Sequence, residues 1–189
     1  MHSQYDKTMV KIQPSDFALI IVCAALFAVG CIASLYLVVI PGVVQLRPGA
    51  AFAPLFGVFF GPLIGGVATF IGSFIWIALL YPASSWTIPI SAFGDLLMAA
   101  IPGYFVYKYP PDLKRAVFWT FIGAGVMAIL QGTAMWLLGW FPLDYAILLV
   151  FGTDMPMAVI GGTILIGLLH KRVKAMGLYR TSKTAPSRP

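Results

Sequence analysis

Residues 46–66 read LRPGAAFAPLFGVFFGPLIGG, and our expectation for the fold of the chain starts from them. It places one arginine, Arg47, at the head of an apolar run that contains no further charge until Asp95. The run is interrupted by Gly61 and Pro62, a pair that is typical of turns. We therefore predict that the chain turns back into a membrane at Gly61 and that Arg47 lies at the mouth of a membrane-embedded binding site.

The composition of the whole chain is that of an integral membrane protein. Of its 189 residues, 60% are hydrophobic and only 10% are charged, whereas a soluble domain carries about 25% charged residues. The net charge of +6 comes from cations at the two ends and in one loop. This distribution indicates membrane topology and contact with lipid headgroups, and it does not favour nucleic-acid binding.

Five apolar runs have at least the roughly 20 residues that a helix needs to cross a bilayer. They are residues 17–40, 62–81, 88–107, 116–141 and 145–169. The first is too long for the apolar part of a signal peptide, so we expect it to be retained as a helix. Residues 48–60 form a shorter run, which would cover only about 20 Å as a helix.

The basic residues decide whether this short run crosses the membrane. If it does, the N-terminal lysines, the basic loop at residues 108–115 and the basic tail from Lys171 all lie on one side. Cytoplasmic loops are enriched in Lys and Arg. We therefore predict an all-α integral membrane protein, a bundle of six transmembrane helices with cytoplasmic N and C termini.

We expect one membrane domain at residues 16–176. A cytoplasmic segment, residues 1–15, would precede it. A polar tail at residues 177–189 would follow it and be disordered, because it has too few apolar residues to fold.

Unusual polar and aromatic side chains are concentrated in the half of this bundle that would face the outside. A carboxylate within a span costs at least about 2.5–3.5 kcal/mol on insertion scales, so Asp95 and Asp154 should face a wet cavity or a charged partner. The candidate substrate-binding residues are Arg47, Trp76, Trp86, Asp95, Gln131, Trp136 and Asp154.

In such a site Arg47 would hold an anionic or strongly accepting group, and the tryptophans would stack on a planar ring. Asp95 or Asp154 would accept hydrogen bonds from the ligand. Simpler alternatives stay open at this point. Trp86 could form an ordinary aromatic belt together with Trp140 and Tyr81. Arg47 could meet headgroups or pair with Asp95, and Gln131 could hold helices together.

The motifs of several enzyme classes are absent from the sequence. It contains no P-loop and no HExxH, and no membrane-depth histidine could serve as a base for a serine nucleophile. Cys23 and Cys31 lie about 12 Å apart on one helix, too far for a disulfide, and two cysteines alone make a poor metal site. We therefore expect no catalytic residues, no metal and no cofactor.

Small residues recur on the first predicted helix. Ala24 and Ala28 are four residues apart, a spacing that lets helices approach closely in a membrane. We expect these two alanines to line a contact with another transmembrane protein, although packing within the chain is the simpler interpretation.

The stretch from Leu46 onward, together with "VATFIGSFI", resembles the second and third helices of S components, the substrate-binding subunits of energy-coupling-factor (ECF) transporters. The shared features are an Arg-Pro start, a small-residue segment, "GVFFGP" at the turn and a glycine-spaced helix after it. Ala24 and Ala28 match the AxxxA pattern of the family's first helix. Many relatives carry Asn or Asp where this chain has Ser73, so substrate contacts at that position are not carried over.

The resemblance implies high-affinity capture of a vitamin or related micronutrient at the cell membrane of a prokaryote. It also implies two kinds of partner, a transmembrane T component and two ATP-binding-cassette ATPases. Two other function classes remain: an ion-coupled secondary transporter that uses Asp95 and Asp154, and a membrane scaffold that binds no small molecule.

Overall fold

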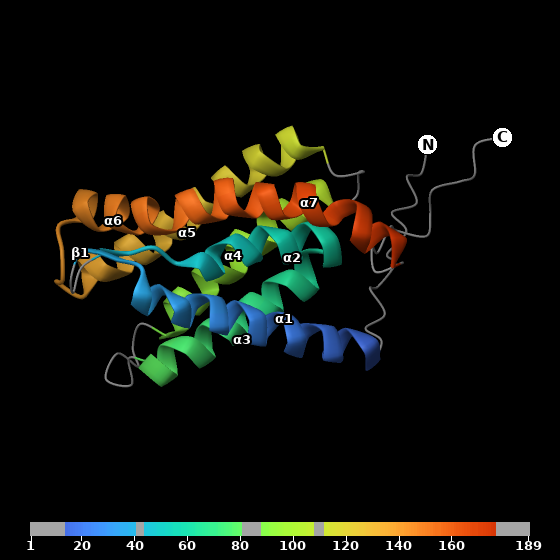
Figure 1. Cartoon of the computed structure of the whole chain (residues 1–189). Coiled ribbons are helices and arrows are strands. Elements are labelled where there is room, and N and C mark those ends of the chain that lie inside the picture. The colour runs from blue at the N-terminus through green and yellow to red at the C-terminus, as the bar shows by residue number, and fades with distance from the viewer. Residues whose placement is uncertain (1–13, 41–43, 81–87, 108–111, 177–189) are drawn as a thin grey trace, which may run out of the picture.

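Helical segments that run between two ends of one bundle make up almost all of the computed structural model (Figure 1), which describes residues 14–40, 44–80, 88–107 and 112–176. Among these residues, five helical segments are long and apolar enough to cross a membrane, and Pro48–Phe60 is a shorter apolar helix. The predicted helical membrane bundle is therefore confirmed. The segments predicted at residues 1–15 and 177–189 lie almost wholly outside the described residues.

The elements follow one another with short connections. In chain order they are α1 (Pro14–Ile32), the 3₁₀ turn η1 (Ala33–Tyr36), β1 (Val38–Ile40), β2 (Val44–Gln45), the 3₁₀ turn η2 (Pro48–Ala51), α2 (Phe52–Phe60), α3 (Pro62–Leu80), α4 (Ile88–Val106), α5 (Leu113–Leu137), α6 (Leu143–Met155), the π-helical segment η4 (Pro156–Gly161) and α7 (Gly162–Ala175).

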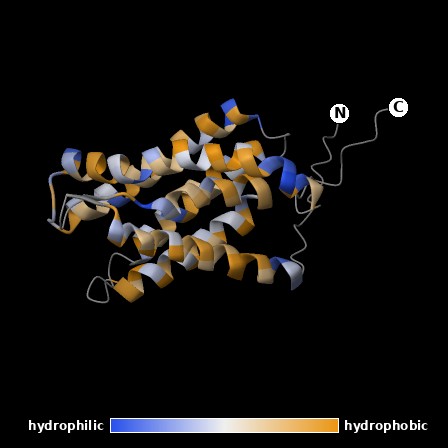
Figure 2. Cartoon of the chain, in the orientation of Figure 1, coloured by the Kyte–Doolittle hydropathy of each residue, from blue (hydrophilic) through white to orange (hydrophobic). Residues whose placement is uncertain are grey.

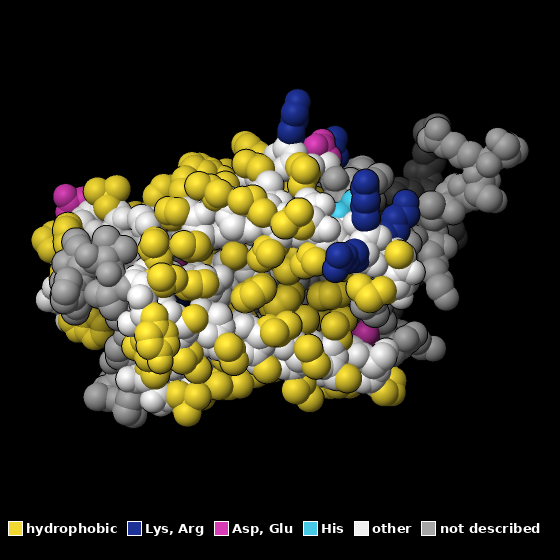
Figure 3. Space-filling model, in the orientation of Figure 1, with side chains coloured by type: hydrophobic (Ala, Val, Ile, Leu, Met, Phe, Trp, Pro, Cys, Tyr) yellow, Lys and Arg dark blue, Asp and Glu magenta, His cyan; other side chains and the backbone are white. Residues whose placement is uncertain are grey.

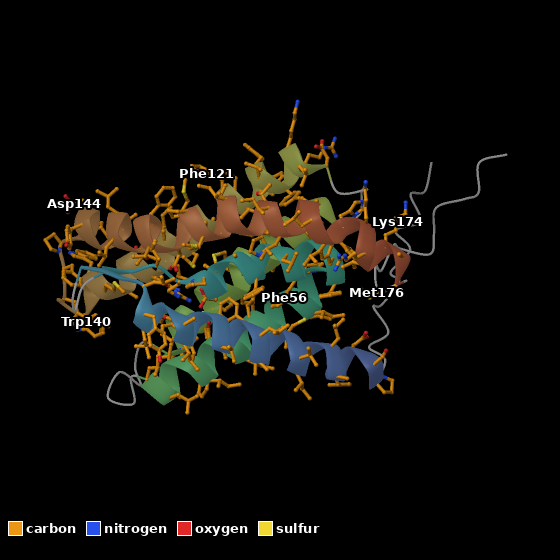
Figure 4. The ribbon with its side chains drawn as sticks, in the orientation of Figure 1. Phe56, Phe121, Trp140, Asp144, Lys174 and Met176 are labelled. Carbon is orange, nitrogen blue, oxygen red and sulfur yellow. The ribbon has the colours of Figure 1, made fainter. Side chains whose placement is uncertain are left out.

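The two ends of the bundle differ in charge. α1 begins and α7 ends at the same end, while β1 and the start of α6 lie at the other (Figure 1). Hydrophobic residues dominate the helices between the ends (Figure 2), and Lys and Arg side chains gather in the half where α7 finishes (Figure 3). Lys174 and Met176 mark that end in Figure 4, and Trp140 and Asp144 mark the opposite one.

The first apolar run is helical over only part of its length, which corrects the prediction of a helix over residues 17–40. The helix ends at Ile32, and Val38–Ile40 instead pairs with Val44–Gln45 as a two-stranded antiparallel hairpin. Residues 35–40 are mostly β-branched or aromatic, types that favour strands. Hydrophobicity alone does not distinguish a buried strand from a buried helix, so the sequence did not reveal the hairpin.

The short helix α2 lies in the middle of the bundle. Its residues from Ala53 to Phe59 are buried, and it packs against α3, α4 and α7. It ends at Gly61, whose φ of +92° suits glycine, and Pro62 begins α3. The predicted short second helix that ends at Gly61 is confirmed.

Helices α2, α3 and α4 cross one another at very short distances. A Cβ added to Gly57 would overlap the main-chain carbonyl of Ala99 on α4, and one added to Gly65 would lie 2.5 Å from the Gly57 nitrogen. Glycine is therefore required at these two positions because backbones touch there. The short helix can leave the lipid altogether because its neighbours approach it this closely.

The last long segment runs from Leu143 to Ala175, beyond both ends of the apolar run at residues 145–169. A proline, Pro156, lies inside it and starts the π-helical segment η4. Proline cannot donate the usual helix hydrogen bond and clashes with the preceding turn, and a wider π turn accommodates both effects. This irregular segment packs against η2, the turn that follows Arg47.

Candidate functional site

Arg47 is held inside the protein at the point where the hairpin joins the helical bundle. It precedes Pro48 as the extended N-cap residue of η2, with φ −102° and ψ 92°. Its side chain is only 11% exposed. The alternative in which Arg47 simply meets lipid headgroups is therefore wrong.

Two aspartates from different helices bind the guanidinium of Arg47. Its Nη2 atom donates to Oδ2 of Asp95 on α4 at 2.9 Å, and its Nη1 atom donates to Oδ2 of Asp154 on α6 at 3.0 Å. The two carboxylates are 0% and 2% exposed. The pairing of Asp95 with Arg47 that we considered from the sequence is thus present, and Asp154 completes it.

Helix α3 fixes Asp95 from the other side. The Ser73 hydroxyl donates to Oδ2 of Asp95, the same oxygen that Arg47 binds. The Thr69 hydroxyl lies 3.1 Å from the main-chain carbonyl oxygen of Asp95. Both α3 residues are fully buried. Ser73 therefore fixes the carboxylate of Asp95, and Thr69 lies against the main chain of the same residue.

Two further side chains contact the guanidinium. Its central carbon lies 4.9 Å from the centre of the Trp76 ring, within the range of a cation–π interaction. Its Nη2 atom is 3.9 Å from the sulfur of Cys31 on α1. We call the set Arg47, Asp95, Asp154, Ser73 and Trp76 the arginine cluster.

The position of Asp154 depends on the irregular last segment. Asp154 comes two residues before Pro156, where η4 begins. η4 packs against η2, and a Cβ on Gly162 would lie 2.6 Å from the Pro54 ring. The π-helical segment that directly follows α6 therefore lies next to the segment that carries Arg47.

The arginine cluster keeps buried atoms that form no hydrogen bond. They are Nε of Arg47, Oδ1 of Asp95 and Oδ1 of Asp154. One guanidinium and two carboxylates sum to a formal charge of +1 − 2 = −1. Unpaired polar atoms of this kind are rare in protein interiors, so they mark a place where a ligand could bind.

The remaining predicted site residues are placed differently. Gln131 on α5 is buried, and its side-chain amide donates to the main-chain carbonyl of Ser91 on α4 at 3.1 Å. This bond is the interhelical role that we considered for it. Trp136, in the last turn of α5, is 47% exposed, and the structure does not show it in contact with the cluster. Trp86 lies outside the described residues.

The two alanines expected at a partner surface are inside the bundle. Ala24 and Ala28 are 2% and 4% exposed. A Cβ added to Gly72 of α3 would lie 2.7 Å from the Ala24 carbonyl oxygen. Both alanines are thus buried within the chain, where α1 packs on α3, and they do not form a surface in this structure. This corrects the predicted interface.

Sequence reasoning missed Ser73, Thr69 and Cys31 as neighbours of the charged residues. Ser73 and Thr69 are four residues apart and so share one face of α3, which was the available signal. Small hydroxyl residues are common in membrane helices, however, so this signal is weak.

A family model matches most of the chain, and a solved structure has a similar fold. A family model described as "ECF-type riboflavin transporter, S component" matches residues 13–176. A search of solved structures finds ThiT from Listeria monocytogenes, with a TM-score of 0.59 and 15% sequence identity over 86% of this chain and 98% of that chain. That likeness concerns the fold alone. No curated protein matches the chain.

Proposed function

Because the chain belongs to the family of ECF-type riboflavin transporter S components, we propose that it captures riboflavin or a closely related vitamin at the arginine cluster. Members of this family are multi-pass membrane proteins that bind a transported substrate and are not enzymes. The observation that carries the proposal is the meeting of Arg47, Asp95 and Asp154, which leaves a buried acceptor on each carboxylate.

The chemistry of the cluster suits a ligand that donates hydrogen bonds. The free Oδ1 atoms of Asp95 and Asp154 can each accept one, and charge-assisted bonds of this kind are among the strong ones. Riboflavin offers such donors in its ring imide and in its hydroxyl-bearing side chain. Its flat ring is also suited to an aromatic side chain such as Trp76, whose ring lies beside the guanidinium.

We further propose that the chain crosses the membrane six times, with both termini in the cytoplasm. The basic residues of α5 and α7 lie in the half of the bundle opposite the hairpin, and the positive-inside rule places that half in the cytoplasm. The cluster then lies in the outer half of the bundle. This orientation is the one that an uptake protein requires.

Energy for uptake would come from partners. The sequence contains no P-loop of its own, so ATP hydrolysis would be supplied by two ATP-binding-cassette subunits through a transmembrane T component. Co-expression with such partners should make vitamin uptake depend on ATP. Uptake that collapses with the proton or sodium gradient would instead support the ion-coupled alternative.

Titration of riboflavin against the purified protein in mild detergent tests the binding role, with quenching of flavin fluorescence as the readout. We expect Asp95→Asn and Asp154→Asn each to raise the dissociation constant for riboflavin about 10- to 100-fold. This change corresponds to the loss of roughly 1.5–3 kcal/mol for a charge-assisted bond. Asp144→Asn is the matched control, because Asp144 lies on the same helix as Asp154 and is exposed. Equal affinities for all three variants and the parent would refute the proposed site.

A further inference from the structure

A basic surface forms where the start of α5 lies beside the end of α7. It carries Lys114 of α5 and Lys171 and Lys174 of α7. We propose that this surface binds the headgroup of an anionic phospholipid from the membrane leaflet at that end of the bundle. None of its residues belongs to the arginine cluster, so its role does not depend on which vitamin the cluster binds.

Leu113 and Gly167 bring the two helices together. Leu113 is the first residue of α5, and a Cβ added to Gly167 of α7 would lie 3.8 Å from both terminal methyl carbons of Leu113. The face of α7 that carries Gly167 therefore points toward the start of α5. Both residues are exposed, so this contact lies at the surface of the bundle.

Two lysines continue the same face of α7 beyond Gly167. Residues four and seven positions apart share a face of an α-helix, so Lys171 and Lys174 lie on the side of Gly167. Both lysines are exposed. Arg172 is exposed as well, but at about 100° per residue it lies about 140° around the helix from Gly167. The lysines therefore face the start of α5, and the arginine faces away from it.

The lysine charges of the basic surface are not neutralised within the part of the chain that the structure describes. No ion pair there joins Lys114, Lys171 or Lys174 to a carboxylate. Asp112, which caps α5, accepts the main-chain N–H of Lys114 with one oxygen and lies 3.9 Å from Arg115 with the other. Three ammonium groups are therefore available to an anion from outside the chain.

The exposed residues that precede the lysines on α7 are apolar. Ile164 and Leu168 are 55% and 69% exposed. Ile164 is seven residues before Lys171 on the same face, which is about 10 Å along the helix. Figure 3 shows the same order on the visible face, with hydrophobic side chains over the helices and Lys and Arg at the end of α7.

This order of side chains suits a phospholipid better than a soluble anion. The acyl chains can lie along the apolar residues while the phosphate meets the lysines. Basic pockets between transmembrane helices are known to bind anionic headgroups in this way. A Lys or Arg near an anionic membrane surface contributes about 1 kcal/mol, which is about five-fold in affinity.

Two lipids with the same acyl chains test the proposal on the unmodified protein. Phosphatidylglycerol has an anionic headgroup, whereas phosphatidylcholine has no net charge. Native mass spectrometry of the purified protein in mild detergent, with either lipid added, measures the two dissociation constants. We expect phosphatidylglycerol to bind at least about ten-fold more tightly than phosphatidylcholine, because three lysines face its phosphate.

Three single variants locate the binding surface on α7. Lys171→Gln and Lys174→Gln should each raise the dissociation constant for phosphatidylglycerol about five-fold. Arg172→Gln is the matched control, because it removes the same charge from the same turn but from the side away from α5. We expect it to change that constant less than about two-fold, since a more distant exposed charge is screened. Thermal unfolding in the same detergent checks that each variant is folded.

Equal binding of the two lipids by the unmodified protein would overturn the proposal and would favour a protein partner for the basic surface. Equal dissociation constants for the three variants, whether raised or not, would also overturn it. Such a result would mean that only the overall charge of this end matters. Riboflavin binding should be the same in all three variants, so a failure of the proposed vitamin site would be seen separately.

Discussion

Replacing Arg47 by methionine should destabilise the protein more than any other single charge change among its described residues. The side chain of Arg47 is 11% exposed, and the two carboxylates it binds are 0% and 2% exposed. Methionine preserves much of the volume and removes only the guanidinium. Two buried carboxylates would then face each other without a counter-ion.

The magnitude follows from the pair distances. Opposite charges about 4 Å apart at an effective dielectric constant of about 20 attract by roughly 4 kcal/mol, and Arg47 makes two such pairs. Desolvation of the three ions offsets part of this attraction, and removing one partner of a buried pair costs about 3–5 kcal/mol in practice. For a chain of this size such a loss lowers the midpoint of thermal unfolding by roughly 6–20 °C.

Thermal unfolding of the purified protein in detergent, followed by tryptophan fluorescence, measures this loss. Arg115→Met is the matched control, because Arg115 lies 3.9 Å from Asp112 in a pair that is more than half exposed, and such pairs contribute at most about 1 kcal/mol. Removing all three charges, with Arg47→Met, Asp95→Asn and Asp154→Asn together, should recover most of the lost stability. A single Arg47→Met variant as stable as the parent would refute the reasoning, since the carboxylates would then not depend on the guanidinium.

Three other predictions follow from the structure. Ser73→Ala should lower the stability by about 1.5–3 kcal/mol in the same unfolding assay, because it removes a buried hydrogen bond to a carboxylate; no change would mean that the bond is not formed. Gly57→Ala should cost about 1–3 kcal/mol because it forces backbones apart, whereas Gly125→Ala, which has open space around it, should be neutral or stabilising. In a cysteine-free background, Tyr145→Cys should react with an impermeant thiol reagent added outside intact cells and Lys114→Cys should not; the opposite pattern would reverse the proposed orientation.

The sequence alone predicted the class of the molecule and several of its decisive points. Its composition required a lipid environment, and Gly61 followed by Pro62 correctly predicted the turn between α2 and α3. Charges are so costly within apolar runs that Arg47, Asp95 and Asp154 could be selected as candidates from rarity alone. Three of the most informative residues of the candidate site could therefore be identified from the amino-acid sequence.

Which of these charges would meet was decided by the tertiary structure. Arg47 is 48 residues from Asp95 and 107 from Asp154, and no local pattern connects positions so far apart. The same is true of Ser73 and Trp76, which join the cluster because α3 packs between α1 and α4. The role of Arg47 changed as a result, from a group that binds an anion to one that is already held by two carboxylates.

The sequence also did not show which face of each helix packs inside the bundle and which face contacts lipid. A soluble helix shows its buried face as an apolar stripe, but in lipid both the exposed and the packed faces are apolar, so that signal is lost. This is why Ala24 and Ala28 were expected at a surface although they pack inside against α3. It is also why the strands of the hairpin looked like more of the first helix. The sequence determined that these residues avoid water, and only the packing of the helices against one another determined which of them avoid lipid as well.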